Sequence, residues 1–225
     1  MKRLTHETVK ALEEGYGKYW WPEGMYPDDF EKDPFKNIII TLLSQNTTEA
    51  NCIRAYRGLA SKFKVTAESL AHADEAELQE SIRCGGLYHV KARRIIQLSR
   101  AVLDRFGGEL TQVLRLPKAD AKQRLMELPG IGDKTADVLL TTRYSYREVI
   151  PVDTHMDRLS KRLGLVDMNS GYDETQKTLI SFIPEDVRER AAGLLWLLAK
   201  HTCKAQKPRC PECPLTVLCD YGEKR

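Results

Sequence analysis

Apolar residues recur every three or four positions along most of this 225-residue chain, which is the spacing of one buried helix face. Few stretches show the alternation of apolar and polar residues that marks a half-buried strand. Glycine and proline, which end helices and form turns, separate the periodic stretches. The pattern therefore predicts an all-α fold, with helices over residues 35–43, 48–63, 75–82, 90–106, 119–126, 134–142, 154–163, 173–182 and 185–201.

Composition and hydropathy narrow the class of protein. Hydrophobic residues make up 42% of the chain and charged residues 30%, which are ordinary values for a globular protein. No apolar run approaches the ~18 residues that a membrane-spanning helix needs. The polar N-terminus lacks the apolar core of a secretion signal. We therefore expect a cytoplasmic protein without a membrane partner.

The net charge of +3 does not by itself indicate a nucleic-acid partner. Its distribution is more informative, because residues 81–105 contain six cations and one acid. Either this stretch forms a basic surface, or its cations belong to ordinary solvated helix faces. The six cations are Arg83, Lys91, Arg93, Arg94, Arg100 and Arg105.

Four of the six cysteines are close together in the pattern C-x6-C-x2-C-x5-C. They are Cys203, Cys210, Cys213 and Cys219. Disulfides are rare in intracellular proteins, so four close thiols indicate a metal site, which holds either a zinc ion or an iron–sulfur cluster. Zinc sites commonly use two short C-x2–4-C pairs and this chain has one, so the spacing favours the cluster. The isolated Cys52 and Cys84 are interpreted as small buried side chains.

The loop between the first two clustered cysteines carries Lys204, Lys207 and Arg209. A metal site that orders this loop fixes its cations, and phosphate is their natural partner. Alternatively, the three side chains only offset the negative charge of the thiolates.

A short hairpin, LPGIG at residues 128–132, joins two of the expected helices. Its two glycines permit positive φ and a close backbone approach, and the unpaired N–H groups at the start of the next helix form an anion site. Lys134 lies in the first turn of that helix, where the helix dipole disfavours a cation, so its amine is a candidate nucleophile. A plain helix–turn–helix bend with an exposed lysine is the alternative interpretation.

Asp153 follows an apolar run and Pro151, and it opens the next expected helix. An aspartate in this position is a common N-cap, worth about 1 kcal/mol. The same carboxylate can accept a proton from Lys134 or stabilise an oxocarbenium ion, and the structural and catalytic roles are compatible. The nearby His155 has no ligand partner at a useful spacing and is interpreted as structural.

Three ordered motifs, LPGIGDKTA, VDTH and the cysteine pattern, make the chain resemble the endonuclease III branch of the helix–hairpin–helix DNA glycosylases. The resemblance extends over residues 35–221. It implies a monomer that carries a [4Fe-4S] cluster and binds double-stranded DNA containing damaged bases or abasic sites. It also implies a six-helix domain at residues 28–147, which contains the hairpin, and an iron–sulfur cluster domain made of residues 1–27 and 148–225.

The resemblance assigns roles to individual residues. Lys134 matches the family's catalytic lysine, Asp153 matches its catalytic aspartate, and the four clustered cysteines match the cluster ligands. The residues expected to contact DNA are Gly130, Ile131 and Gly132 in the hairpin, Leu87 as a wedge, Gln45 or Asn46 as the filler of the gap left by the extruded base, and Lys207 and Arg209 on the backbone. The choice between Gln45 and Asn46 stays open, because LSQNT at residues 43–47 departs from the family's usual S-A-Q-A-T.

The expected function is that of a base-excision-repair enzyme. It removes damaged bases, with oxidised pyrimidines as the expected class, through a Schiff base on Lys134. It then cuts the strand 3′ of the abasic site by β-elimination. Two other classes stay open: a monofunctional glycosylase for mismatched thymine or uracil or for alkylated purines, and a non-catalytic DNA-binding module. The segments YWWP, at residues 19–22, and LSQNT are similar to an endonuclease III-related group that removes alkylated purines, but that group lacks the lysine.

Overall fold

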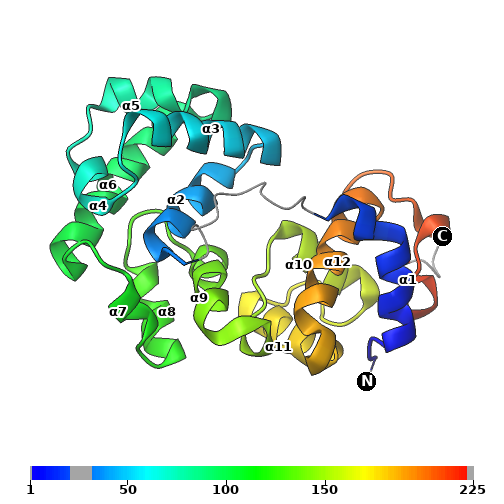
Figure 1. Ribbon diagram of the computed structural model, residues 1–225. Coiled ribbons are helices and arrows are strands. Elements are labelled where there is room, and N and C mark those ends of the chain that lie inside the picture. Colours follow the sequence, from blue (N-terminus) through cyan, green and yellow to red (C-terminus); the bar gives the residue numbers. More distant parts are fainter. Residues whose placement is uncertain (1, 21–31, 222–225) are drawn as a thin grey trace. The chain divides into compact units, whose positions relative to one another are not determined.

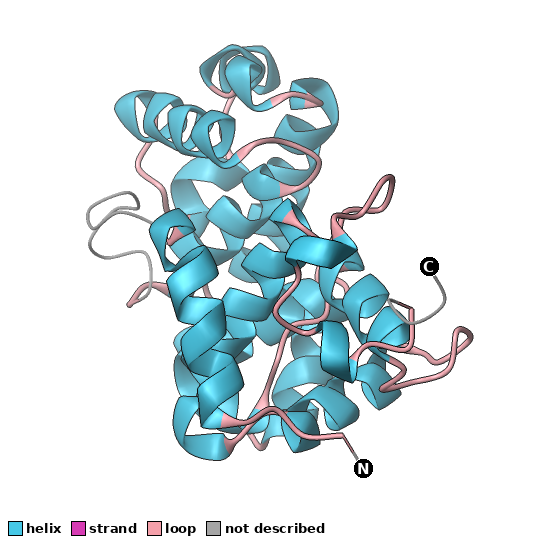
Figure 2. Ribbon diagram, turned by 90° about the vertical axis from the view of Figure 1, so that its right-hand side faces the viewer, coloured by secondary structure: helices cyan, strands magenta, loops and turns pink. Residues whose placement is uncertain are grey.

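The computed structural model describes residues 2–20 and 32–221, which form helices and loops without a strand (Figure 1, Figure 2). The prediction of an all-α fold is therefore confirmed. Trp21 and Pro22 of the aromatic N-terminal motif lie outside the described residues. Among the described residues, no helix combines the length and the apolar character that crossing a bilayer requires.

The chain divides into two compact units. One consists of Pro22–Arg143 and is called the hairpin unit below. The other combines Met1–Trp21 with Tyr144–Arg225 and is called the cysteine unit. The expected domain bounds at residues 28 and 147 stay a prediction.

The hairpin unit is built around α2, whose residues from Asn37 to Leu43 are all buried. The helix starts where Asp33 caps it, with the Oδ1 atom accepting from the backbone N–H of Phe35 at 2.9 Å. Helix α6 packs against α2, α4 and α5. It ends at Phe106, and the next residue, Gly107, caps it in a left-handed backbone conformation. The elements of this unit are α2 (Pro34–Ser44), α3 (Glu49–Lys62), α4 (Ala67–Ala71), α5 (Glu75–Ser81), η2 (Arg83–Gly85), α6 (Tyr88–Phe106), α7 (Thr111–Leu114), α8 (Lys118–Met126) and α9 (Asp133–Glu148), which continues past the unit's bound.

The cysteine unit is centred on α12, which packs against both α1 and α10. Its leucines and alanines from Ala191 to Ala199 form the middle of the core. Tyr16 joins α1 to the end of α12 by donating its hydroxyl to Thr202 Oγ1 at 2.7 Å. The elements are α1 (His6–Tyr16), η1 (Gly17–Tyr19), α10 (Thr154–Leu163), α11 (Tyr172–Phe182), η3 (Glu185–Val187), α12 (Arg188–His201), η4 (Cys210–Glu212) and η5 (Thr216–Leu218).

The structure corrects several expectations. Helices α1, α4 and α7 were not expected; α4 and α7 have only five and four residues, too few to display a period. Helix α9 extends six residues beyond the expected end at residue 142, to Glu148. Of the two isolated cysteines, Cys52 is buried as expected but Cys84 is exposed. Lys91, one of the six cations considered for a basic surface, is only 3% exposed.

Candidate active site

The hairpin between α8 and α9 is a tight turn with one left-handed position, which a glycine occupies. Gly130 has a φ of +80°, so a side chain there is strained, and the next residue, Ile131, turns inward and is buried. Gly132 does not have a positive φ, which corrects the expectation for the second glycine. A Cβ atom on Gly132 would meet nothing within 4 Å, so no neighbour in the described chain demands a glycine there.

An ion triad fastens the two helices of the hairpin. Lys122 on α8 lies 3.0 Å from Asp133 Oδ1 and 3.3 Å from Asp137 Oδ2 on α9. Burial alone acts to lower the pKa of Lys122, but the hydrogen bonds and charges of the two carboxylates raise it overall. Because the Asp137 carboxylate is buried, the pair holds the start of α9 in a defined orientation.

Lys134 lies in the first turn of α9, immediately after the hairpin. Its positive charge reaches Cys52 on α3, where it acts to lower the pKa of the thiol. Burial dominates at Cys52, however, and raises that pKa to about 11. Cys52 is therefore a neutral thiol at neutral pH and supplies no negative charge to stabilise the lysine ammonium.

Two loops of the hairpin unit carry the expected DNA contacts. Leu87 has a left-handed φ of 50° and is 56% exposed, which is unusual for a large apolar side chain. Asn46 also has a left-handed φ, 52°, and is exposed. Left-handed backbone costs an apolar residue roughly 1–2 kcal/mol, so surrounding contacts must hold Leu87 in place, whereas asparagine adopts this conformation readily. Gln45 differs from Asn46, because its Oε1 atom accepts from Arg94 Nη1 at 3.4 Å.

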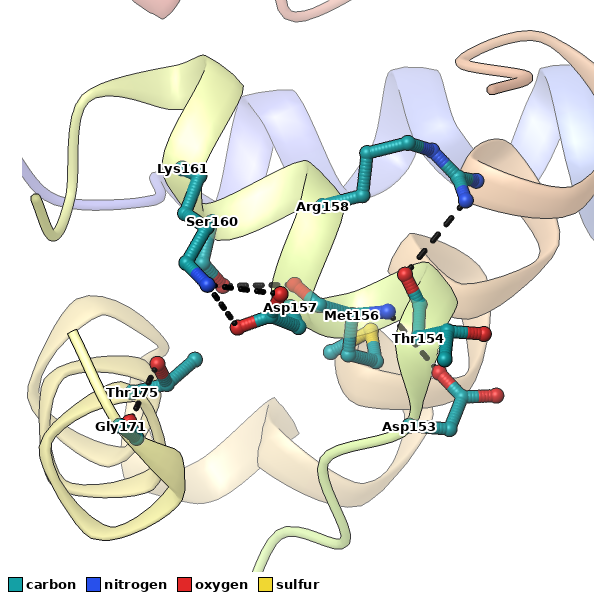
Figure 3. A network of polar contacts seen from close by, with 9 residues as sticks. All are labelled: Asp153, Thr154, Met156, Asp157, Arg158, Ser160, Lys161, Gly171 and Thr175. Atoms are coloured by element: carbon teal, nitrogen blue, oxygen red, sulfur yellow. Dashed lines mark hydrogen bonds and ion pairs between the residues drawn. The ribbon is translucent and has the colours of Figure 1, made fainter. Parts of the chain in front are cut away.

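Asp153 caps α10, and Figure 3 shows one of its carboxylate oxygens bonded to the backbone of Met156. Both of its carboxylate oxygens have partners. The Oδ1 atom accepts from the backbone N–H groups of His155 and Met156, each at 2.9 Å. The Oδ2 atom accepts from the indole Nε1–H of Trp196 at 2.7 Å. The N-cap was expected, but Trp196 was not, because it is separated from Asp153 by 43 positions in an apolar helix and nothing local signals the contact.

His155 belongs to a polar network that connects the start of α10 with the end of α12. Its Nδ1 atom lies 3.1 Å from Arg158 Nη2, and its ring meets Trp196 edge-on at 6.0 Å. Arg158 also donates to the backbone oxygens of Ala199 at 2.8 Å and Cys203 at 3.0 Å. These contacts agree with a structural interpretation of His155.

The four clustered cysteines line one pocket, whose walls include the apolar side chains of Leu159, Leu163 and Pro208. Burial raises the pKa of the Cys213 thiol to about 11. Arg162 donates to Cys203 Sγ at 3.3 Å, which is a hydrogen bond to sulfur of the kind that tunes a bound metal centre. Within the described residues, no three His, Cys, Asp or Glu side chains converge as they do around a single metal ion.

The two cations expected to contact the DNA backbone differ from each other. Lys207 is exposed and has a left-handed φ of 48°. Arg209 is engaged within the chain, because it pairs with Glu212 Oε2 at 3.0 Å and donates to the backbone oxygen of His201 at 3.0 Å. Both side chains are therefore exposed, but Arg209 is also engaged by contacts within the chain.

Comparison with known proteins identifies the family. Residues 39–185 match the family described as HhH-GPD superfamily base excision DNA repair protein. The chain is 36% identical over 193 residues to endonuclease III of Bacillus subtilis, covering 86% of this chain and 84% of that protein. It is 31% identical over 191 residues to endonuclease III of Escherichia coli, covering 85% of each. The chain belongs to the endonuclease III family.

Solved structures agree with this family membership. A structure described as a trapped endonuclease III–DNA covalent intermediate has a TM-score of 0.77 and 31% identity, covering 99% of each chain. A thermostable thymine-DNA glycosylase, at 20% identity and a TM-score of 0.72, shares the fold. This endonuclease III family member is a base-excision-repair DNA glycosylase with DNA as its partner, and AP lyase activity is typical of its family.

Proposed function

We propose that this glycosylase removes oxidised pyrimidines from duplex DNA and then cuts the strand 3′ of the abasic site, with Lys134 as the nucleophile and Asp153 as its acid–base partner. The observation that supports this assignment is the position of Lys134 in the first turn of α9, directly after the hairpin. A covalent mechanism also agrees with the relative that was trapped as a covalent intermediate with DNA.

The proposed chemistry proceeds by covalent amine catalysis. The amine of Lys134 attacks C1′ of the extruded nucleotide, the N-glycosidic bond breaks, and the base leaves with the bonding electrons. Asp153 accepts the proton that the attacking amine loses. The sugar ring opens to a Schiff base as Asp153 returns this proton to the ring oxygen, the C2′ proton passes to water as the 3′ phosphate leaves, and water then hydrolyses the Schiff base to release Lys134.

The hairpin is proposed to bind the phosphate backbone without reading sequence. The backbone N–H groups of Gly130, Ile131 and Gly132 and the start of α9 supply donors and the positive end of a helix dipole. The open space around Gly132 supports this role, because it leaves room for a phosphate where a side chain would stand. Lys207 adds a cation, while the ion pair with Glu212 limits what Arg209 contributes.

Leu87 and Asn46 are proposed to enter the duplex when the damaged nucleotide is extruded. Leu87 is an exposed apolar side chain immediately before α6, which suits a wedge between bases. We assign the gap-filling role to Asn46 rather than Gln45, because the amide of Gln45 is engaged by Arg94. Asn46→Ala then slows base release more than Gln45→Ala does, and the reverse order contradicts the assignment.

The four clustered cysteines are proposed to hold a [4Fe-4S] cluster, whose role is to order the C-terminal residues. Four thiols around one pocket with apolar walls fit the thiolate ligands that such a cluster requires. The purified protein should contain iron and absorb visible light. A colourless protein that is active with bound zinc contradicts this assignment.

We also propose that the protein is a monomer and acts on chromosomal DNA in the cytoplasm. It follows from the DNA substrate and from the family, and light scattering of the purified protein in the presence of duplex DNA tests the monomer.

Borohydride trapping tests the central assignment. Wild-type enzyme should form a covalent complex with duplex DNA containing thymine glycol, and Lys134→Gln should form none. Asp153→Asn should trap at least tenfold more slowly, because the proton acceptor is lost. Lys118→Gln is a matched control, since Lys118 also stands in the first turn of a helix, α8.

The outcomes separate the candidate functions. If Lys134→Gln traps as well as wild type, Lys134 is not the nucleophile. A panel of duplexes, each with thymine glycol, uracil, mismatched thymine, an alkylated purine or 8-oxoguanine, then defines the substrate. Release of an alkylated purine or a mismatched base without trapping identifies the enzyme as a monofunctional glycosylase instead.

A further inference from the structure

One buried ammonium group lies between the two loops that carry Asn46 and Leu87. Lys91, in the first half of α6, is 3% exposed. Its Nζ atom donates to the backbone oxygen of Leu43 at 2.7 Å and to that of Gly85 at 2.9 Å. These two carbonyl groups belong to segments that are far apart in the sequence.

Both acceptors are carbonyl groups at the end of a helix. Leu43 lies one residue before the end of α2, and Gly85 is the last residue of η2. The last carbonyls of a helix lack partners within it and carry the negative end of its dipole. A single cation therefore satisfies two such groups and holds the ends of α2 and η2 together.

Burial is unfavourable for the charged form of Lys91 unless polar groups replace the water that the ammonium group loses. Burial lowers the pKa of Lys91, and the neighbouring Cys52, a neutral thiol at neutral pH, supplies no charge that offsets this. Cys52 itself is buried and donates its thiol to the backbone oxygen of Ile40 at 3.5 Å. The carbonyl oxygens of Leu43 and Gly85 thus provide the polar contacts that replace water around the ammonium group.

The two carbonyls lie close in sequence to the residues that we propose contact DNA. Asn46 follows Leu43 by three positions, and Leu87 follows Gly85 by two. Both Asn46 and Leu87 have left-handed φ values, and for the apolar Leu87 this conformation persists only where surrounding contacts enforce it. Lys91 also anchors its own end of the second loop, because its backbone N–H donates to the Leu87 oxygen at 2.9 Å.

We propose that Lys91 is a positioning residue that joins the gap-filling loop and the wedge loop into one rigid element. The inference rests on the proposed DNA contacts of Asn46 and Leu87. Its consequence is that the wedge and the filler enter the duplex together, so that the extruded nucleotide is held out long enough to react. Lys91 itself touches neither DNA nor the reacting atoms.

The experiment compares a step that needs the opposite strand with one that does not. The first measurement is single-turnover base release from a duplex with one lesion. The second is borohydride trapping on an abasic site in single-stranded DNA, where no gap and no opposing base exist. Lys91→Met removes the ammonium and keeps the length of the side chain. Lys62→Met, at an exposed position on α3, is the control.

Lys91→Met should slow base release from the duplex at least tenfold, since small misplacements of positioning groups reach about 100-fold in rate. Trapping on the single strand should stay within about twofold of wild type, because the reacting groups are unchanged. An equal loss in both measurements shows a merely structural role and overturns the proposal. So does unchanged activity in both. If Lys91→Met does not fold, Lys91→Gln is measured in the same way, with a smaller loss but the same selectivity for the duplex.

Leu87→Ala separates this inference from the function on which it rests. If Leu87→Ala releases the base from duplex DNA as fast as wild type, the wedge assignment itself is wrong. If Leu87→Ala is slow but Lys91→Met is not, only the inference about Lys91 is wrong. Where both are slow, the double variant should be little slower than Leu87→Ala alone, because Lys91 acts through the loop that Leu87 occupies. Additive losses contradict the proposal.

Discussion

The two units stabilise their irregular segments in different ways. In the hairpin unit, Lys91 binds two loops through carbonyl groups that the chain itself provides. In the cysteine unit, Arg158 and Arg162 on α10 donate to backbone oxygens of the tail, but these contacts reach only Cys203–Ala205. Beyond them, the described tail to residue 221 buries a single side chain, Leu215.

The difference shows how far polar contacts can order a segment without a core. A short loop between two helices has both ends fixed, so one buried cation suffices to define its conformation. The tail follows α12 at its start and contacts α10 near its end, where the backbone N–H of Tyr221 donates to the Arg162 oxygen at 3.1 Å, but between these points it has almost no apolar core of its own. It therefore needs an additional source of order, and a cluster held by four cysteines is such a source.

The largest effect is expected when the proposed cluster is removed. Cys213→Ser should lower the melting temperature by roughly 10 °C or more, since metal binding contributes several kcal/mol of folding energy and each kcal/mol shifts a chain of this size by about 2–4 °C. The variant should also lose its visible absorbance. Cys84→Ser, at an exposed cysteine outside the pattern, is the control. If Cys213→Ser melts like wild type, the tail is ordered by the chain alone.

A smaller effect is expected from the arginine that supports the tail. Arg162→Met removes donations to the backbone oxygens of Lys204 at 2.7 Å and Ala205 at 3.0 Å, and one to Cys203 Sγ. We expect a loss of about 1–3 kcal/mol in the free energy of unfolding. The reduction potential of the proposed cluster should fall as well, because a hydrogen bond to sulfur stabilises the more negative, reduced form.

Denaturant unfolding and voltammetry measure these two changes. Arg3→Met, at an exposed position near the N-terminus, is the control for loss of a cation from the same unit. A variant with unchanged potential and reduced stability would show that Arg162 orders the loop without affecting the cluster.

The contact between Trp196 and Asp153 should matter for rate more than for stability. Trp196→Phe keeps an aromatic ring but removes the N–H that donates to Oδ2 at 2.7 Å. We expect single-turnover base release to slow roughly tenfold, which corresponds to about 1.4 kcal/mol, because the carboxylate is then fixed through one oxygen only. The binding constant for lesion-containing duplex should not change. A weaker binding constant with an unchanged rate contradicts a role in orienting Asp153.

The effect that is smallest at neutral pH concerns the two isolated cysteines. Cys52 has a pKa of about 11, raised by burial, whereas in the unfolded chain its pKa is near the ordinary value of 9.0. The unfolded thiol therefore loses its proton first, and the free energy of unfolding falls between about pH 9 and pH 11, by up to about 2 kcal/mol. Cys52→Ala should remove this part of the pH dependence. At pH 7.5, an alkylating reagent should modify Cys84 and leave Cys52 intact.

Much of the fold could be predicted from the sequence because helices have local causes. The helix over residues 154–163 was predicted to the residue, since Asp153 caps its start and Gly164 ends it in a left-handed conformation. The hairpin was predicted from its glycines, although only Gly130 has the expected positive φ. The short α4 and α7 were missed, because they are held by packing rather than by a pattern of their own.

The helical spacing of apolar residues was enough to predict an all-α fold. The order of the motifs indicated the family and the residues proposed for the chemistry. The tertiary structure decided what surrounds them: Lys91 is buried between two loops, Cys84 is exposed, and Trp196 donates to Asp153. These contacts join residues 43 to 48 positions apart or depend on which side of a helix faces the core. Their energy comes from burial and hydrogen bonding that exist only after the helices have packed, so no local pattern can encode them.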